Sequence, residues 1–139
     1  MVCLALLLAL GACHHDSDQA KVRAAIADAA SAARDNDAGA LAQVLSDDFD
    51  ARQGVLDRRR LLALLRLNAF HGEHVGVVLG PIDVQARGER MLADFTVTLS
   101  DGGRSRWLPQ QLGVYQVHSA WKREHGRWRC FAASAQRKL

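Results

Sequence analysis

The chain has 139 residues, of which 49% are hydrophobic and 24% charged, and this composition is typical of a single globular domain rather than a disordered chain. The net charge is only +3, and no basic stripe with interleaved aromatic residues is present, which argues against a nucleic acid partner. Of the three cysteines, Cys3 and Cys13 lie at the N-terminal end and Cys130 near the C-terminus, so cysteine counting predicts no disulfide framework.

The N-terminal segment is almost purely apolar from residue 2 to residue 12. It is shorter than the ~20 residues needed to span a bilayer, and its length suits the core of a secretory signal. The following tetrapeptide, Leu10-Gly11-Ala12-Cys13, resembles the lipobox of bacterial lipoproteins, which implies cleavage before Cys13 and acylation of that cysteine. We therefore expect a signal peptide over residues 1–12, a lipidated tether over residues 13–19 and a folded domain over residues 20–139. The alternative is a buried N-terminal helix.

Two details of this segment bear on location. No Lys or Arg follows Met1, in contrast to an ordinary signal peptide. His14 follows the cysteine where inner-membrane lipoproteins often carry Asp, so the lipobox resemblance implies the periplasmic face of the outer membrane. The polar residues 14–19 contain no second cluster of metal ligands at fixed spacing, and we expect neither a metal nor a cofactor.

Three helices are predicted after the tether. The first covers Ala20 to Arg34, with an apolar stripe at Val22, Ile26, Ala29 and Ala33. Two aspartates are placed to cap the next helices: Asp37 before Ala38 to Leu45, and Asp57 before Arg58 to Asn68. Residues 46–48 are expected to end the second helix as a loop. Arg58-Arg59-Arg60 is interpreted as a solvated helix face, with contact to lipid phosphates as the alternative.

The second half of the chain has strand patterns. Residues 74–79 and 82–87 are predicted as separate strands because Gly80-Pro81 lies between them. Met91 to Leu99 alternates, with Met91, Ala93, Phe95, Val97 and Leu99 on one face. Residues 111–136 are predicted as a long hairpin with its turn at residues 122–126. Helices first and antiparallel strands afterwards indicate an α+β domain.

The order of these elements resembles the nuclear transport factor 2-like superfamily, over about Gln19 to Gln136. Tyr115, Trp121 and Gly126-Arg127-Trp128-Arg129 are similar to the V-Y-x-V, W and G-x-W patterns that close such domains. The resemblance implies helices packed in a strongly curved, mostly antiparallel sheet, a cystatin-like cone with an apolar hollow. It extends to small proteobacterial lipoproteins of that superfamily, and superfamily members often dimerise through the outer sheet face.

Six residues are candidates for lining the hollow: Tyr115, Trp121, Trp128, Phe95, His118 and Asp94. The superfamily's isomerases need a general base and an oxyanion hole formed by a Tyr and a protonated acid. Here the alternation places His118 on the face of Val114 and Gln116, opposite Tyr115. Cys130 is interpreted as a buried hydrophobe rather than a nucleophile.

Three functions follow as hypotheses. We favour a membrane-anchored, non-catalytic domain that binds a small apolar ligand or another protein. The alternatives are an isomerase or cyclase-like enzyme acting on a small apolar substrate, and a structural envelope protein that forms a homodimer through the sheet.

Overall fold

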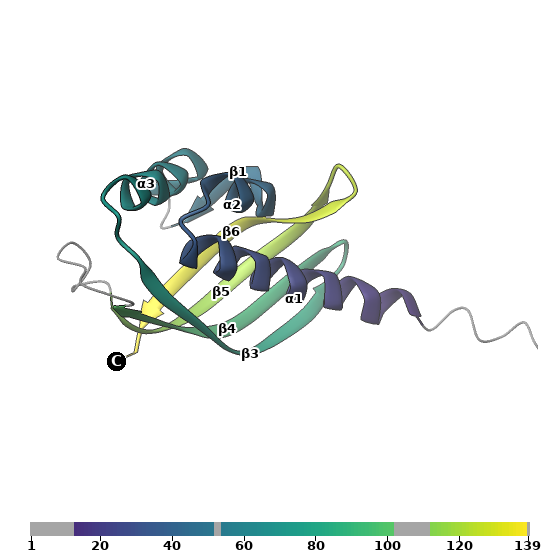
Figure 1. Ribbon diagram of the computed structural model, residues 1–139. Helices are drawn as coiled ribbons and strands as arrows, with labels where there is room; N and C mark the ends of the chain where they lie inside the picture. Colours follow the sequence, from purple (N-terminus) through teal and green to yellow (C-terminus); the bar gives the residue numbers. More distant parts are fainter. Residues whose placement is uncertain (1–12, 52–53, 102–111, 139) are drawn as a thin grey trace, which may run out of the picture.

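The protein folds as three helices against one six-stranded sheet in the computed structural model, which describes residues 13–51, 54–101 and 112–138 (Figure 1). This arrangement confirms the α+β prediction. The signal peptide predicted over residues 1–12 lies outside the described residues. In chain order the elements are α1 (Cys13–Arg34), α2 (Ala38–Val44), β1 (Leu45–Ala51), β2 (Leu56–Asp57), α3 (Arg58–Phe70), β3 (Val75–Arg87), β4 (Arg90–Asp101), β5 (Gly113–Glu124) and β6 (Arg127–Arg137).

The sheet is mixed, with the strand order β2-β1-β6-β5-β4-β3. Only β1 and β6 pair in parallel, and the other neighbours are antiparallel. Strands β1 and β2 are not predicted by the sequence pattern, which indicates a loop at residues 46–48 within what is β1. In β1, Leu45 and Ser46 are both buried and Asp47 and Asp48 are both exposed, so the period of two that identifies a strand is absent.

Helix caps follow the sequence prediction. Asp37 Oδ1 accepts the backbone N–H of Ala40 at 3.0 Å, and Asp57 Oδ1 accepts that of Arg60 at 2.8 Å. The first helix differs, because it begins at Cys13 rather than Ala20, so the predicted tether is helical. None of the helices in the described ranges combines the length and apolar character needed to cross a bilayer.

Strand β3 is one continuous element, where the sequence analysis predicted two strands separated by Gly80-Pro81. The strand lies at the edge of the sheet, where a proline's missing N–H costs no ladder hydrogen bond. The pairing register with β4 shifts between Leu79 and Ile82, which accommodates the proline in an irregularity rather than a break.

The β5–β6 hairpin has a two-residue turn, shorter than the predicted one. His125 and Gly126 both have positive φ, 53° and 77°, as a type I′ turn requires. Glu124 and Arg127 pair across the turn, so both strands continue almost to its tip.

The core lies between α1 and the inner face of the curved sheet, which wraps around this helix (Figure 1). Val22 of α1 is fully buried, and Ala93 of β4 is equally inaccessible. Completely burying a valine side chain contributes roughly 1.5–3 kcal/mol to the stability of the fold. Met91, Ala93 and Phe95 of the predicted apolar face contact this core, which confirms the orientation of β4.

Candidate functional site: an apolar cavity beneath α3

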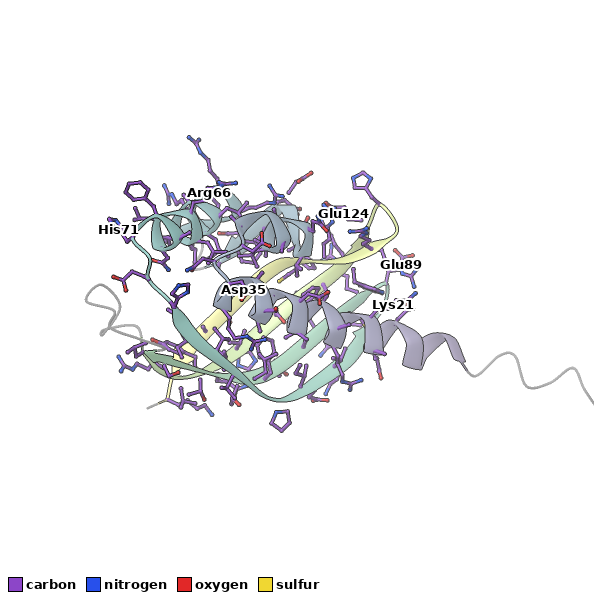
Figure 2. All side chains as sticks on the ribbon, in the orientation of Figure 1. Lys21, Asp35, Arg66, His71, Glu89 and Glu124 are labelled. Carbon is purple, nitrogen blue, oxygen red and sulfur yellow. The ribbon has the colours of Figure 1, made fainter. Side chains whose placement is uncertain are left out.

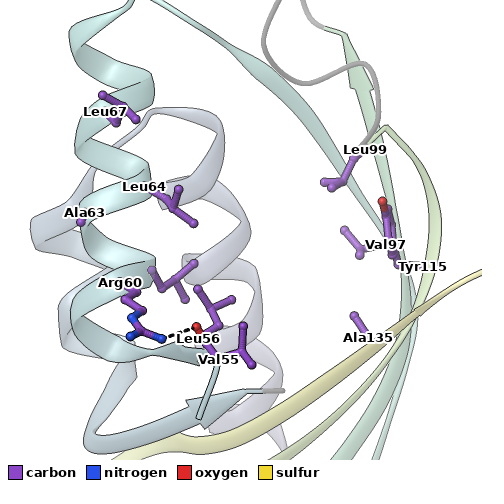
Figure 3. Close-up of a pocket in the computed structure, with 11 residues that line it drawn as sticks. Val55, Leu56, Arg60, Ala63, Leu64, Leu67, Val97, Leu99, Tyr115 and Ala135 are labelled. Carbon is purple, nitrogen blue, oxygen red and sulfur yellow. Dashed lines mark hydrogen bonds between the residues drawn. The ribbon is translucent and has the colours of Figure 1, made fainter. Parts of the chain in front are cut away.

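An apolar cavity of about 720 Å³ lies between α3 and the far end of the sheet (Figure 3). Its helical wall is made by the end of β2 and one face of α3, and its sheet wall by β4, β5 and β6. The lining residues are Val55, Leu56, Arg60, Leu61, Ala63, Leu64, Leu67, Val97, Leu99, Tyr115 and Ala135.

The helical wall exists because α3 is apolar on two sides. Leu62 and Leu65 are buried in the core, while Leu64 and Leu67 on another side are about half exposed and face the cavity (Figure 3). A surface helix needs only one apolar stripe to pack against a core. The additional leucines therefore have no core to fill, and they line an open cavity instead.

The sheet wall follows from strand register. Val97 of β4 and Tyr115 of β5 are direct cross-strand partners, and Ala135 of β6 pairs with Val117 on the same face. Ala135 contributes only a methyl group to this wall, which keeps the cavity open.

Among the described lining residues, only Arg60 and Tyr115 carry polar side-chain groups. Arg60 Nη1 donates to the backbone carbonyls of Gly54, at 3.2 Å, and Val55, at 2.9 Å, which holds the guanidinium at the cavity rim (Figure 3). A guanidinium has five N–H donors, so its Nε and Nη2 can still bind an anionic group. The cavity thus combines an apolar body with one cationic rim group.

Of the six residues predicted to line the hollow, Tyr115 does so. Phe95 lies on the same face of β4 as the lining residue Val97, but it packs against the core. Trp121 is 3% exposed in the core, where its indole donates to Ser119 Oγ at 2.9 Å. Trp128 lies at the other end of the sheet and lines a second, polar hollow between α1, α2 and the β5–β6 turn.

Asp94 and His118 are brought together but away from the cavity. Asp94 Oδ1 and His118 Nδ1 are 2.6 Å apart, and both side chains are about half exposed. They are cross-strand partners next to the buried pair Ala93 and Ser119, so strand alternation directs them to the outer face of the sheet. They therefore do not meet Tyr115, as the face assignment of His118 predicted.

The cavity residues of α3 and β2 are not among the six that the sequence predicts. The available signal was the density of leucines at positions 61, 62, 64, 65 and 67, which exceeds one helical stripe. Cys130, by contrast, matches its interpretation, because burial raises the pKa of its thiol to about 12.

A second polar cluster lies on the outer face near β1. The buried Ser46 hydroxyl donates toward Glu124 and lies 2.5 Å from Asp48 Oδ1. The hydrogen bond from Ser46 is the main cause that lowers the pKa of Glu124, with partial burial acting against it. Lys122 Nζ donates to Asp48 Oδ2 at 2.8 Å, and this bond is the main cause that lowers the pKa of Asp48. Among the described residues, no group of three or more His, Cys, Asp or Glu side chains is arranged to hold a metal ion.

The three helices and the curved, mostly antiparallel sheet form the cystatin-like, nuclear transport factor 2-like fold, as the sequence resemblance implied. The fold is shared with a nuclear transport factor 2-like protein from Cytophaga hutchinsonii, with a TM-score of 0.67 and 14% identity over 90% of this chain and 98% of that one. A nuclear transport factor 2-like protein from Novosphingobium aromaticivorans, described with a cystatin-like fold, gives a TM-score of 0.68 and 20% identity over 87% and 82% of the two chains.

A third similar structure is a protein of this fold family from Streptomyces avermitilis with a proposed dehydratase role. Its TM-score is 0.69 and its identity 16%, over 90% of this chain and 99% of that one. No family model matches the sequence, and no curated protein matches it. At these identities the likeness establishes the fold.

Proposed function

We propose that this protein is an envelope lipoprotein, anchored through Cys13, whose domain binds a small molecule with an apolar body and an anionic head without transforming it. The observation that carries the proposal is the cavity of about 720 Å³, lined by leucines, valines and alanines with Arg60 at its rim. Ligand sites of this size typically have mostly apolar walls and a few polar groups that fix orientation.

The rim arginine supports a ligand with a carboxylate or similar head. With Nη1 held by the Gly54 and Val55 carbonyls, the guanidinium has a set position and keeps donors for two oxygens of an anion. The leucines of α3 and the Val97–Leu99 wall would then contact the apolar body. A medium-chain fatty acid has this combination of properties.

An isomerase or cyclase-like enzyme is the alternative, and the proposed dehydratase role of the Streptomyces avermitilis protein favours testing it. Proton abstraction needs a positioned base of suitable pKa. The described lining residues include no carboxylate or imidazole, and the Asp94–His118 pair lies on the outer face. This supports binding over catalysis.

Binding is tested with dodecanoate and dodecanol, which share an apolar body and differ in charge. We expect dodecanoate to bind more tightly, and Arg60→Gln to weaken dodecanoate by roughly 10- to 100-fold, the range of a charge-assisted hydrogen bond. Dodecanol should be little affected by that substitution. Equal losses for both ligands would contradict the assigned role of Arg60.

The cavity itself is tested by filling it. Ala135→Phe places a ring between the two walls and should abolish binding of both ligands, with an unchanged circular dichroism spectrum. Ala27→Phe, on the exposed surface of α1, is the matched control and should bind normally. Retained binding in the Ala135→Phe variant would show that the ligand site lies elsewhere.

The anchor is tested separately, by labelling cells with a fatty-acid probe. We expect the label on the unchanged protein and not on Cys13→Ser; a Cys13→Ser protein that still takes the label would rule the anchor out. Fractionation of labelled cells tests the proposed outer-membrane location. Pairing through the outer sheet face remains a further proposal, which a strictly monomeric sedimentation profile would contradict.

A further inference from the structure

The outward face of α3 combines exposed apolar side chains with positive charge. Five large hydrophobic residues are exposed in the described residues, and four of them lie on α3 or at the cavity rim: Val55 (63% exposed), Leu64 (49%), Leu67 (50%) and Phe70 (85%). Isolated exposed apolar residues are ordinary, but a group at one site usually marks an interaction surface.

The charge on this helix has one sign. Arg58–Phe70 contains four arginines and no Asp or Glu. Arg58 is directed inward, since its Nη2 donates to the Ala42 carbonyl at 3.0 Å, and Arg60 is held at the cavity rim. Arg59 and Arg66 are exposed, and Figure 2 shows Arg66 pointing away from the body of the protein.

The helical spacing places these two arginines and Phe70 on one stripe. Positions 59, 66 and 70 follow the i, i+7, i+11 repeat, and Ala63 and Leu67 lie beside them. The stripe borders the side of α3 that lines the cavity, because Ala63 and Leu67 belong to both.

We propose that this face of α3 docks on an anionic phospholipid surface, with Phe70 and Leu67 entering the interface and Arg59 and Arg66 contacting lipid phosphates. The arginines without any acidic neighbour on the helix complement a negatively charged bilayer, and helices that lie in a membrane interface share this basic and apolar composition. Docking would turn the cavity rim toward the lipid. The inference concerns the outer surface and stands whether or not the cavity holds a ligand.

The test uses the full chain with Cys3→Ser and Cys13→Ser, so that an environment-sensitive dye can be attached at one introduced cysteine. Cys130 is buried and remains. The reporter is His71→Cys, next to Phe70, and the matched control is Glu89→Cys in the β3–β4 turn, which lies at the opposite end of the molecule (Figure 2). Because both carry the same N-terminal segment, a difference between them reports on α3.

With vesicles of phosphatidylglycerol and phosphatidylcholine, we expect the emission of the dye to shift to the blue at position 71 and to change little at position 89.

Each arginine near an anionic surface contributes about fivefold to partitioning, so Arg59→Glu/Arg66→Glu should weaken partitioning onto these vesicles at least tenfold. Arg87→Glu/Arg127→Glu makes the same charge change at the other end of the sheet, and it should leave partitioning within about twofold because salt screens distant charges. Phe70→Ser should weaken binding by roughly tenfold.

Three results would overturn the proposal. Equal shifts at positions 71 and 89 would mean that the N-terminal segment alone inserts. An emission shift of the same size with vesicles of pure phosphatidylcholine would show that the arginines do not contribute to binding. A shift at position 71 that grows with protein concentration in the absence of vesicles would identify the face as a contact between two copies of the chain.

Discussion

Asp18 of α1 and Arg123 of β5, separated by 105 positions in the sequence, form an ion pair with 2.6 Å between Oδ1 and Nη2. The Trp128 indole also donates to this Asp18 oxygen, at 3.4 Å, and the Arg123 guanidinium lies 5.1 Å from the Trp128 ring centre. The pair therefore joins the first half of α1 to the tip of the β5–β6 hairpin.

This contact predicts a pH-dependent effect of Asp18→Asn. Partial burial acts to raise the pKa of Asp18, but hydrogen bonds from Arg123 and Trp128 and the charges of Arg123 and Lys21 lower it overall. A lowered folded-state pKa stabilises the protein above the unfolded value of about 4, and this contribution is lost as the pH falls through the folded-state pKa. Asp18→Asn should thus lower Tm at pH 7, and the difference in Tm from the unchanged protein should disappear in acid.

The control is the double variant with Arg123→Ala. If the two residues act together, the substitutions should have less than additive effects on Tm at pH 7. Fully additive effects would show that the ion pair does not stabilise the fold. Hydrogen exchange should also increase in the first turns of α1 around Asp18.

Ser46→Ala tests the polar cluster that links β1 to the end of β5. The substitution removes the hydroxyl that donates toward Glu124, and we expect it to lower the free energy of unfolding by about 2 kcal/mol at pH 7, as for hydrogen bonds to charged groups. Because Ser46 lowers the folded-state pKa of Glu124, this contribution is present above about pH 4 and is lost in more acidic solution.

Urea denaturation of the Ser46→Ala and unchanged proteins at several pH values would measure this difference. The gap between their free energies of unfolding should narrow as Glu124 becomes protonated. A gap that stays constant from neutral to strongly acidic solution would show that the lost hydroxyl acts through packing and not through the carboxylate. In Glu124→Gln the effect of Ser46→Ala should be smaller at pH 7.

Two glycine substitutions should have opposite effects on stability. Gly126 has a φ of 77° in the hairpin turn, and Gly126→Ala should destabilise the protein by about 1 kcal/mol. Gly39 lies within α2, and a Cβ there would meet its nearest neighbour, Asp37 Oδ1, at an ordinary 3.5 Å. Gly39→Ala should therefore stabilise by roughly 0.5–1 kcal/mol. An unchanged or raised urea midpoint for Gly126→Ala would contradict the turn assignment, and a lowered midpoint for Gly39→Ala would contradict the placement of Gly39 within α2.

The exposed Asp94–His118 pair should not affect ligand binding. Asp94→Asn is expected to change the free energy of unfolding by less than about 1 kcal/mol, because the pair is half exposed. Its dodecanoate affinity, measured by calorimetry, should equal that of the unchanged protein. A loss as large as that of Arg60→Gln would instead place the outer face in the binding site.

Local patterns were sufficient for much of the fold. Asp37 and Asp57 were assigned as helix caps because a cap depends only on a side chain and the next few amides. The same holds for the strand faces, since alternation alone separates Tyr115 and Trp121 from His118. The break predicted at Gly80-Pro81 is wrong because the effect of a proline depends on whether its strand lies at a sheet edge, and edge position is a property of the whole sheet.

By itself, then, the sequence determined the α+β class, the starts of α2 and α3, the buried faces of β4 and β5 and the hairpin turn region, all of which arise from interactions between near neighbours. Only the tertiary structure decided that β1 pairs in parallel with β6, that Ser46 meets Glu124, and that the extra leucines of α3 face Val97 and Tyr115 across an open cavity. Those contacts join residues far apart in the chain, and whether an apolar face is buried or left lining a cavity depends on which distant element packs against it.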